Sequence, residues 1–143
     1  MRSLCGVLLL GLIVSAGYLQ AQGLTVADYP AKMKQVAQTN GELQKALKAG
    51  TAADAVGPAK TLAGIFADVE KFWAAQKKDD AVKLAATARM GFSDAAAAAA
   101  KGDVMAAQMA AGNALGTCKQ CHGLYREGNP QEGFKFKAGA VTE

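Results

Sequence analysis

Apolar residues recur at helical spacing in four successive segments, and this periodicity limits the fold more than any other feature of the chain. Short turns join the segments, and no run alternates between apolar and polar residues as strands do. Apolar residues make up 51 % of the 143 residues, which is enough for a packed core. We therefore expect an all-α fold, an antiparallel four-helix bundle. The expected helices run from Asp28 to Gly50, from Thr51 to Gln76, from Asp80 to Gly102 and from Asp103 to Gly128.

Aspartates stand at the start of three of these helices, where a carboxylate can accept hydrogen bonds from the first N–H groups. The expected N-caps are Asp28, Asp80 and Asp103. Pro30 fits the first turn of the first helix, because its missing N–H costs little there. The pair Gly57-Pro58 predicts either a late start of the second helix or a kink near its beginning.

The tail that follows the fourth helix, residues 131–143, contains one short alternating piece. This piece is Phe134-Lys135-Phe136-Lys137. Two arrangements of the tail stay open. In one, the two aromatic rings pack against the bundle, and in the other the tail is mobile.

The first residues read as a targeting segment. Arg2 precedes an apolar run, Leu4 to Ala16, and small residues follow around Ala16 and again at Ala21. The run is shorter than the ~20 residues that span a bilayer. We therefore expect residues 1–21 to be a signal peptide and residues 22–143 to be an exported, periplasmic domain with no membrane span. An uncleaved membrane anchor is the alternative.

The charge of the chain is modest, with a formal net charge of +4 that includes Arg2 of the targeting segment. The basic residues are spread along the sequence and are not clustered with aromatic residues. This pattern does not indicate a nucleic-acid-binding surface. A weakly basic surface favours the encounter with an acidic redox partner protein.

The most informative motif is Cys118-Lys119-Gln120-Cys121-His122, near the end of the fourth expected helix. Cys5 lies in the targeting segment. Cys-x-x-Cys-His is the attachment signal of c-type haem. Two cysteines three residues apart lie about one helical turn apart on the same side, so each thiol can reach one vinyl group. The histidine that follows is then the proximal iron ligand, and the chain is expected to carry one covalently bound haem.

Three other readings of this motif fit the chain less well. A zinc site needs four ligands, and the motif offers three. A thioredoxin-like pair belongs at a strand-to-helix turn of an α/β fold, whereas this motif lies in a helical chain. A structural disulfide between Cys118 and Cys121 within a helix would be strained.

The sixth iron ligand, if it is a side chain, is expected to be a methionine, because His122 is the only histidine in the chain. Met105 and Met109 lie too far along the same helix to reach the opposite haem face, and we expect them in the core. Met90 lies ~15 Å from the haem end of its helix. Met33 is the best candidate, because the start of the first helix meets the end of the fourth in an antiparallel bundle. An open iron site beside a core methionine is the alternative.

The nine residues from Cys118 to Arg126, placed near the end of a four-helix bundle, resemble the class II cytochromes c, the cytochrome c prime family. In architecture the resemblance covers nearly the whole mature chain. It implies that the residue at position 33 decides the function. A methionine there implies a low-spin electron carrier, and a residue that does not bind iron implies a high-spin protein that binds nitric oxide or carbon monoxide.

The same resemblance raises two further expectations. Family members often carry an arginine one turn before the distal residue, near the haem propionates, whereas this chain has Tyr29 there. Lys32 or Lys34 is a candidate replacement. Family members also often form homodimers through their first two helices.

Tyr125 and Arg126 are expected near the haem or its propionates, and the alternative is an aromatic ring and a solvated charge at the helix end. We expect an electron carrier and not an enzyme, because the sequence shows no nucleophile–base pair and its single histidine is assigned to iron.

Overall fold

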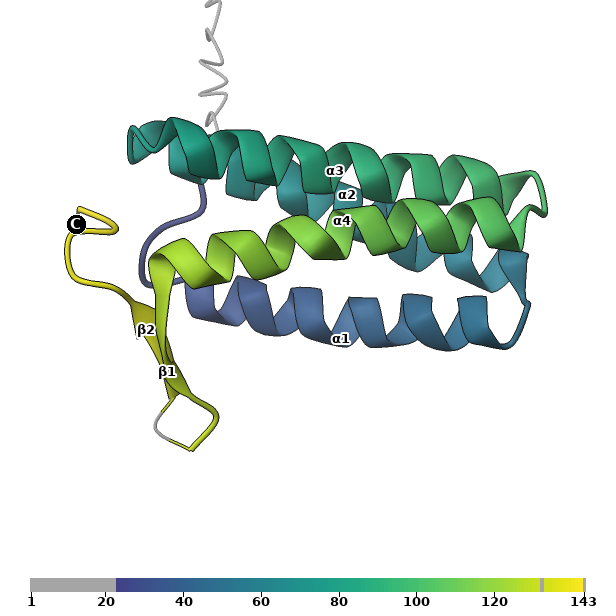
Figure 1. Ribbon diagram of the computed structural model, residues 1–143, viewed down its shortest axis with the longest axis horizontal. Coiled ribbons are helices and arrows are strands. Elements are labelled where there is room, and N and C mark those ends of the chain that lie inside the picture. The colour runs from purple at the N-terminus through teal and green to yellow at the C-terminus, as the bar shows by residue number, and fades with distance from the viewer. Residues whose placement is uncertain (1–22, 132, 143) are drawn as a thin grey trace, which may run out of the picture.

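Four helices pack against one another to form a helical bundle, and a short β-hairpin follows the last helix (Figure 1). The structure, a computed structural model, describes residues 23–131 and 133–142. The expected signal peptide, residues 1–21, lies outside the described residues. The elements are α1 (Tyr29–Lys48), α2 (Ala52–Ala75), α3 (Asp79–Ala100), α4 (Val104–Tyr125), β1 (Arg126–Asn129) and β2 (Gly133–Phe136).

The turns of the bundle lie at its two ends. The α1–α2 and α3–α4 turns are at one end, and the α2–α3 turn is at the other, beside the hairpin (Figure 1). Each expected helix is present with ends that differ by a few residues from the expectation. Among the described helices, none is long and apolar enough to cross a membrane.

Two of the three expected aspartates stand at N-cap positions, and one of them makes the capping hydrogen bond. The Asp103 carboxylate accepts a hydrogen bond from the Ala106 N–H at 2.9 Å. Asp28 is the N-cap residue of α1, but its carboxylate accepts the hydroxyl proton of Thr25 and no hydrogen bond from the helix. The prediction for Asp80 is wrong, because α3 begins one residue earlier and Asp80 lies inside its first turn.

The structure confirms the expectation for one of the two prolines and contradicts the expected late helix start at the other. Pro30 lies in the first turn of α1, as expected. Pro58 lies inside α2, which begins at Ala52, so the expectation of a late start is wrong. Pro58 is seven residues into α2, and the six residues before it are already helical.

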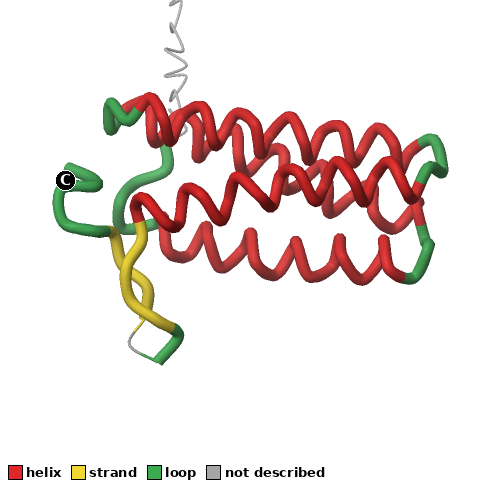
Figure 2. Tube along the Cα trace, in the orientation of Figure 1, coloured by secondary structure: helices red, strands yellow, loops and turns green. Residues whose placement is uncertain are grey.

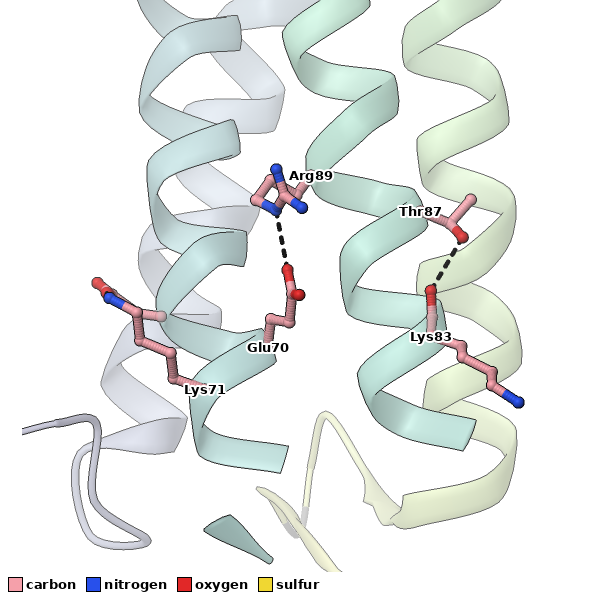
Figure 3. A network of polar contacts seen from close by, with 6 residues as sticks. Glu70, Lys71, Lys83, Thr87 and Arg89 are labelled. Carbon is pink, nitrogen blue, oxygen red and sulfur yellow. Dashed lines mark hydrogen bonds and ion pairs between the residues drawn. The ribbon is translucent and has the colours of Figure 1, made fainter. Parts of the chain in front are cut away.

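The helices pack unevenly around the bundle. α2 packs extensively on α3, α3 on α4 and α1 on α2, whereas α1 and α4 touch little. The largest fully buried side chains are Leu43, Leu47, Leu62, Trp73 and Phe92. On the outer surface, the Arg89 guanidinium of α3 pairs with Glu70 of α2 at 2.8 Å (Figure 3). Because α1 and α4 touch little, the side of the bundle between these two helices is where it has room for a ligand.

The buried face of α4 differs from the expected one. Met105 and Met109 are 73 % and 67 % exposed, so their placement in the core is wrong. Alanines occupy the buried positions of α4 instead, namely Ala107, Ala111 and Ala114. The ideal Cβ position of Gly91 in α3 lies only 3.0 Å from the Ala114 Cβ, so larger side chains do not fit between these helices.

Two strands that the sequence did not predict follow α4, and the second of them lies in the tail. β1 and β2 pair in antiparallel fashion, with Arg126 opposite Phe136 and Asn129 opposite Gly133 (Figure 2). The Phe136 ring packs on the bundle, 4.9 Å from the Tyr29 ring between centroids. Of the two arrangements left open for the tail, the packed one is confirmed for this ring.

Candidate cofactor-binding site

A cavity of about 560 Å³ opens at the hairpin end of the bundle, lined by residues of all four helices and the hairpin. Its volume is within the ~300–1,000 Å³ range of small-molecule and cofactor sites. Most of its wall is apolar or aromatic. The lining includes side chains of α1 (Tyr29, Met33, Lys34, Asn40), α2 (Trp73), α4 (Cys118, Cys121, His122, Tyr125) and the hairpin (Arg126, Phe134, Lys135, Phe136).

The two cysteines of the motif line this cavity as free thiols. They lie on α4 and are three residues apart, so they share a side of the helix. Burial raises the pKa of Cys118, and it raises the pKa of Cys121 to about 11, to which the charges of Cys118 and Asp80 add. Both sulfurs therefore carry their protons at neutral pH.

His122 lines the same cavity and is half-buried. Burial and the neighbouring Arg126 charge lower the pKa of its imidazole. The neutral ring is therefore favoured at pH 7, and this is the form that binds a metal.

Met33 lines the same cavity from α1, the helix on the other side of the gap from α4. The other methionines expected to survive cleavage, Met90, Met105 and Met109, are exposed and do not line it. The structure thus brings together all four residues that the sequence nominated as a site. The ligand roles of these residues stay predictions.

An aromatic cluster lies at the hairpin end of the bundle, beside the cavity. Neighbouring rings of this cluster have centroids 4.6 to 6.0 Å apart, and its members are Tyr29, Phe72, Trp73, Tyr125 and Phe136. The buried Trp73 indole N–H donates to the Tyr29 hydroxyl at 3.1 Å, and burial raises the pKa of that phenol. The sequence signal for Tyr29 was its place four residues before Met33, on the same helical face. Phe136 had no such signal, because its contact depends on the hairpin.

Tyr125 connects the cavity to the start of α3. Its hydroxyl donates to the Asp80 carboxylate, and its ring lies 4.6 Å from the Trp73 ring between centroids. Desolvation, followed by this hydrogen bond, raises the pKa of Tyr125 to about 12. The bond also lowers the pKa of Asp80. Tyr125 is therefore a fixed, neutral part of the wall.

Three basic side chains complete the lining: Lys34 of α1, Arg126 of β1 and Lys135 of β2. The Arg126 guanidinium lies 4.0 Å from the centroid of the Phe134 ring. Lys32, the other candidate replacement for the family arginine, lies in a different surface depression. Of the two lysines, Lys34 is therefore the one that reaches this cavity.

One polar atom in the wall lacks a partner. The side-chain oxygen of Asn40 is buried and accepts no hydrogen bond within the described part of the chain. Buried polar atoms of folded proteins are nearly always hydrogen-bonded, to water or a ligand where protein groups are absent. The Asn40 oxygen is therefore an exception among the buried polar atoms of the described residues.

The residues present fit a covalently held haem. Two protonated thiols one turn apart, a neutral imidazole beside them and an apolar wall are what such a group requires. Within residues 23–131 and 133–142, no three or more His, Cys, Asp and Glu side chains converge to hold a metal ion by themselves.

No known protein family matches this chain, and neither do any of the curated proteins or the solved structures.

Proposed function

We propose that this protein is an exported, periplasmic c-type cytochrome that carries single electrons. Its architecture is then an antiparallel four-helix bundle with one haem c attached near the C-terminal end of the last helix. One observation carries the proposal: Cys118, Cys121 and His122 line the same apolar cavity as Met33. The proposal implies that residues 1–21 direct export.

The two thiols would act as the covalent anchors. Each adds its S–H across one vinyl group, so that the sulfur bonds to one vinyl carbon and the proton goes to the other. This addition needs no oxidant or reductant. Cys118 and Cys121 are both partly buried in the cavity wall, where burial raises the pKa of each thiol and so favours the protonated form that the addition uses.

The imidazole and the thioether would hold the iron from two sides. His122, whose neutral ring is favoured at pH 7, would be the proximal ligand, and Met33 would be the distal ligand. When bound, haem supplies reversible one-electron exchange between Fe(II) and Fe(III). A methionine sulfur favours the reduced state and raises the potential relative to a second histidine.

A second function uses the same cavity without Met33 as ligand. The protein would then bind nitric oxide or carbon monoxide at an open distal position. The specific observation in its favour is the weak contact between α1 and α4, because it leaves a cavity of about 560 Å³ between Met33 and the helix that carries His122.

Visible spectra of the protein made with haem-maturation machinery test both functions. We expect a low-spin spectrum in both oxidation states that carbon monoxide leaves unchanged. Met33→Ala is expected to become high-spin and to bind carbon monoxide. Met109→Ala is the matched control, because Met109 is exposed and outside the cavity, and it should behave like the wild type.

Two results would change the proposal. A wild-type protein that is high-spin and binds carbon monoxide would reject Met33 as ligand and favour gas binding. A protein without covalent haem, although made with the same machinery, would reject both functions.

A further inference from the structure

The outer face of α4 carries two large apolar side chains that the described part of the chain leaves in solvent. Met105 and Met109 lie one turn apart and are 73 % and 67 % exposed. α4 has no charged residue before Lys119, so this face is uncharged over about four turns. The other three helices interrupt their outer faces with exposed charges, among them Lys34, Lys60 and Lys83.

The exposed residues of this face follow the spacing of a helix–helix contact line. Met105, Met109, Gly112 and Gly116 are separated by steps of four, three and four residues, and Lys119 follows three residues later. All five residues are exposed. Alternating steps of three and four residues keep side chains in one line along a helix, as in a coiled coil. A second helix can therefore pack along the whole line.

The two glycines of the line leave gaps in the surface. The Cβ positions of Gly112 and Gly116 have nothing within 4 Å, so packing inside the described chain does not require glycine at either place. Glycine is nevertheless among the poorest helix formers. The line thus has a half with two large side chains, Met105 and Met109, and a half with two gaps.

The two halves fit each other when this face meets a copy of itself that runs in the opposite direction. In one antiparallel register, Met109 faces Gly112 of the partner subunit and Met105 faces the partner's Gly116. The same register sets Lys119 within one residue of the level of the partner's Asp103, the N-cap residue of α4. Each of these contacts occurs twice, as a two-fold symmetric interface requires.

We propose that the outer face of α4, residues 105–119, binds a second copy of this chain in antiparallel orientation and forms a symmetric dimer. The partner is a second copy because size and charge are both self-complementary along this line. The interface uses α4, unlike the dimers through the first two helices that the family resemblance implies, and it does not depend on a bound haem. The line is about 21 Å long, so the dimer is small, weak and concentration-dependent.

Sedimentation equilibrium of the purified mature chain tests the proposal. We expect the mass of a monomer near about 5 µM and of a dimer near about 500 µM. Gly112→Gln fills the gap that receives Met109 of the partner subunit, and should weaken the dimer by about 30-fold. Its Cβ position is open, so the helical circular dichroism should not fall. Gly64→Gln is the matched control, an exposed glycine of α2 with open space, and should dimerise like the wild type.

The orientation of the two helices is tested by charge. Lys119→Glu should weaken the dimer by about 10-fold, because it sets a carboxylate beside the partner's Asp103 at both ends. Lys60→Glu changes the net charge equally from α2 and should have no effect. In a parallel dimer, Lys119 would face Lys119 of the partner subunit, and Lys119→Glu would only exchange one like-charged pair for another.

Three results would overturn the proposal. These are a monomer throughout the concentration range, a dimer that Gly112→Gln leaves intact, and a dimer that Lys119→Glu leaves unchanged. A dimer weakened by Gly64→Gln alone would place the interface on α2. Haem attachment is measured independently by visible spectra, so the chain can be a cytochrome without this interface.

Discussion

At the residue scale, small side chains decide how α3 and α4 meet. The buried positions of α4 are three alanines and Thr117, and the facing helix presents Gly91. An ideal Cβ on Gly91 would lie 3.0 Å from the Ala114 Cβ and 3.1 Å from the Ala110 carbonyl oxygen. At this point the two helices are therefore held together by close packing of their backbones, and not by the burial of large side chains.

Gly91→Ala tests this contact. Alanine favours the helix by up to ~1 kcal/mol over glycine, but overpacking against another backbone costs ~1–3 kcal/mol. We expect the free energy of unfolding to fall by about 1 kcal/mol in urea titrations. Gly64→Ala is the matched control, with nothing within 4 Å of its Cβ position, and it should gain about 0.5–1 kcal/mol. If both variants gained the same free energy of unfolding, α4 would have shifted away from the new methyl group at little cost.

The bond from Tyr125 to Asp80 predicts a pH-dependent contribution to stability. The bond lowers the folded-state pKa of Asp80, so its contribution is present above the unfolded value of ~3.9 and is lost as the pH falls through the lower folded value. Asp80→Asn should lower Tm by roughly 2–4 °C at pH 7, and the difference should shrink as the pH falls through the folded-state pKa of Asp80. Asp79→Asn removes the same charge from the same turn, so an identical pH profile for that variant would contradict the role of the bond.

At the element scale, the hairpin depends on glycines with positive φ, which the sequence pattern does not reveal. Residues 126–129 show no apolar alternation, and three of these four residues are exposed. The chain reverses because Gly128 and Gly133 adopt φ of +91° and +84°, which other residues avoid. The sequence predicted that the fourth helix ends at Gly128, whereas α4 ends three residues earlier, at Tyr125, and nothing in the sequence indicated that Gly133 would pair back onto Asn129.

Gly128→Ala is expected to open the hairpin and leave the bundle folded. The new Cβ would lie 2.2 Å from the Gly133 carbonyl oxygen, on backbone at positive φ. Phe136 would then leave the aromatic cluster, and the emission of Trp73, the single tryptophan, should shift to longer wavelength. Helical circular dichroism should stay unchanged.

A matched control separates the hairpin from α4 itself. Gly112→Ala has open space at its Cβ position on α4 and should leave the emission as in the wild type. Wild-type emission in Gly128→Ala would show that Phe136 stays in place without the turn.

At the scale of the whole molecule, periodicity predicted the helices, and counting residues along antiparallel helices predicted that Met33 and His122 share one end. Periodicity could not tell which face of α4 is buried, because alanine and methionine both count as apolar. The narrow α3–α4 contact accepts the alanines and leaves Met105 and Met109 outside. The place of Lys135 in the cavity wall was equally hidden, since it depends on the hairpin.

The uneven packing of the bundle predicts where a bound cofactor would stabilise it. α1 packs well on α2 but hardly on α4, and the cavity with Met33 lies in that gap. A group that fills the cavity binds the folded state alone, so Tm should rise by at least ~10 °C between the chain without haem and the haem-loaded protein. Hydrogen exchange should locate the gain in α1, around residues 33–40, more than at the buried contact of α2 with α3.

The chain with Cys118→Ala and Cys121→Ala is the control for attachment, because it keeps His122, Met33 and the cavity wall. If the amides of α1 exchanged at the same rate with and without haem, the packing of α1 on α2 alone would stabilise this helix. The distal ligand would then sit on a wall whose position does not depend on the cofactor, and Met33 would be preorganised for the iron before haem arrives.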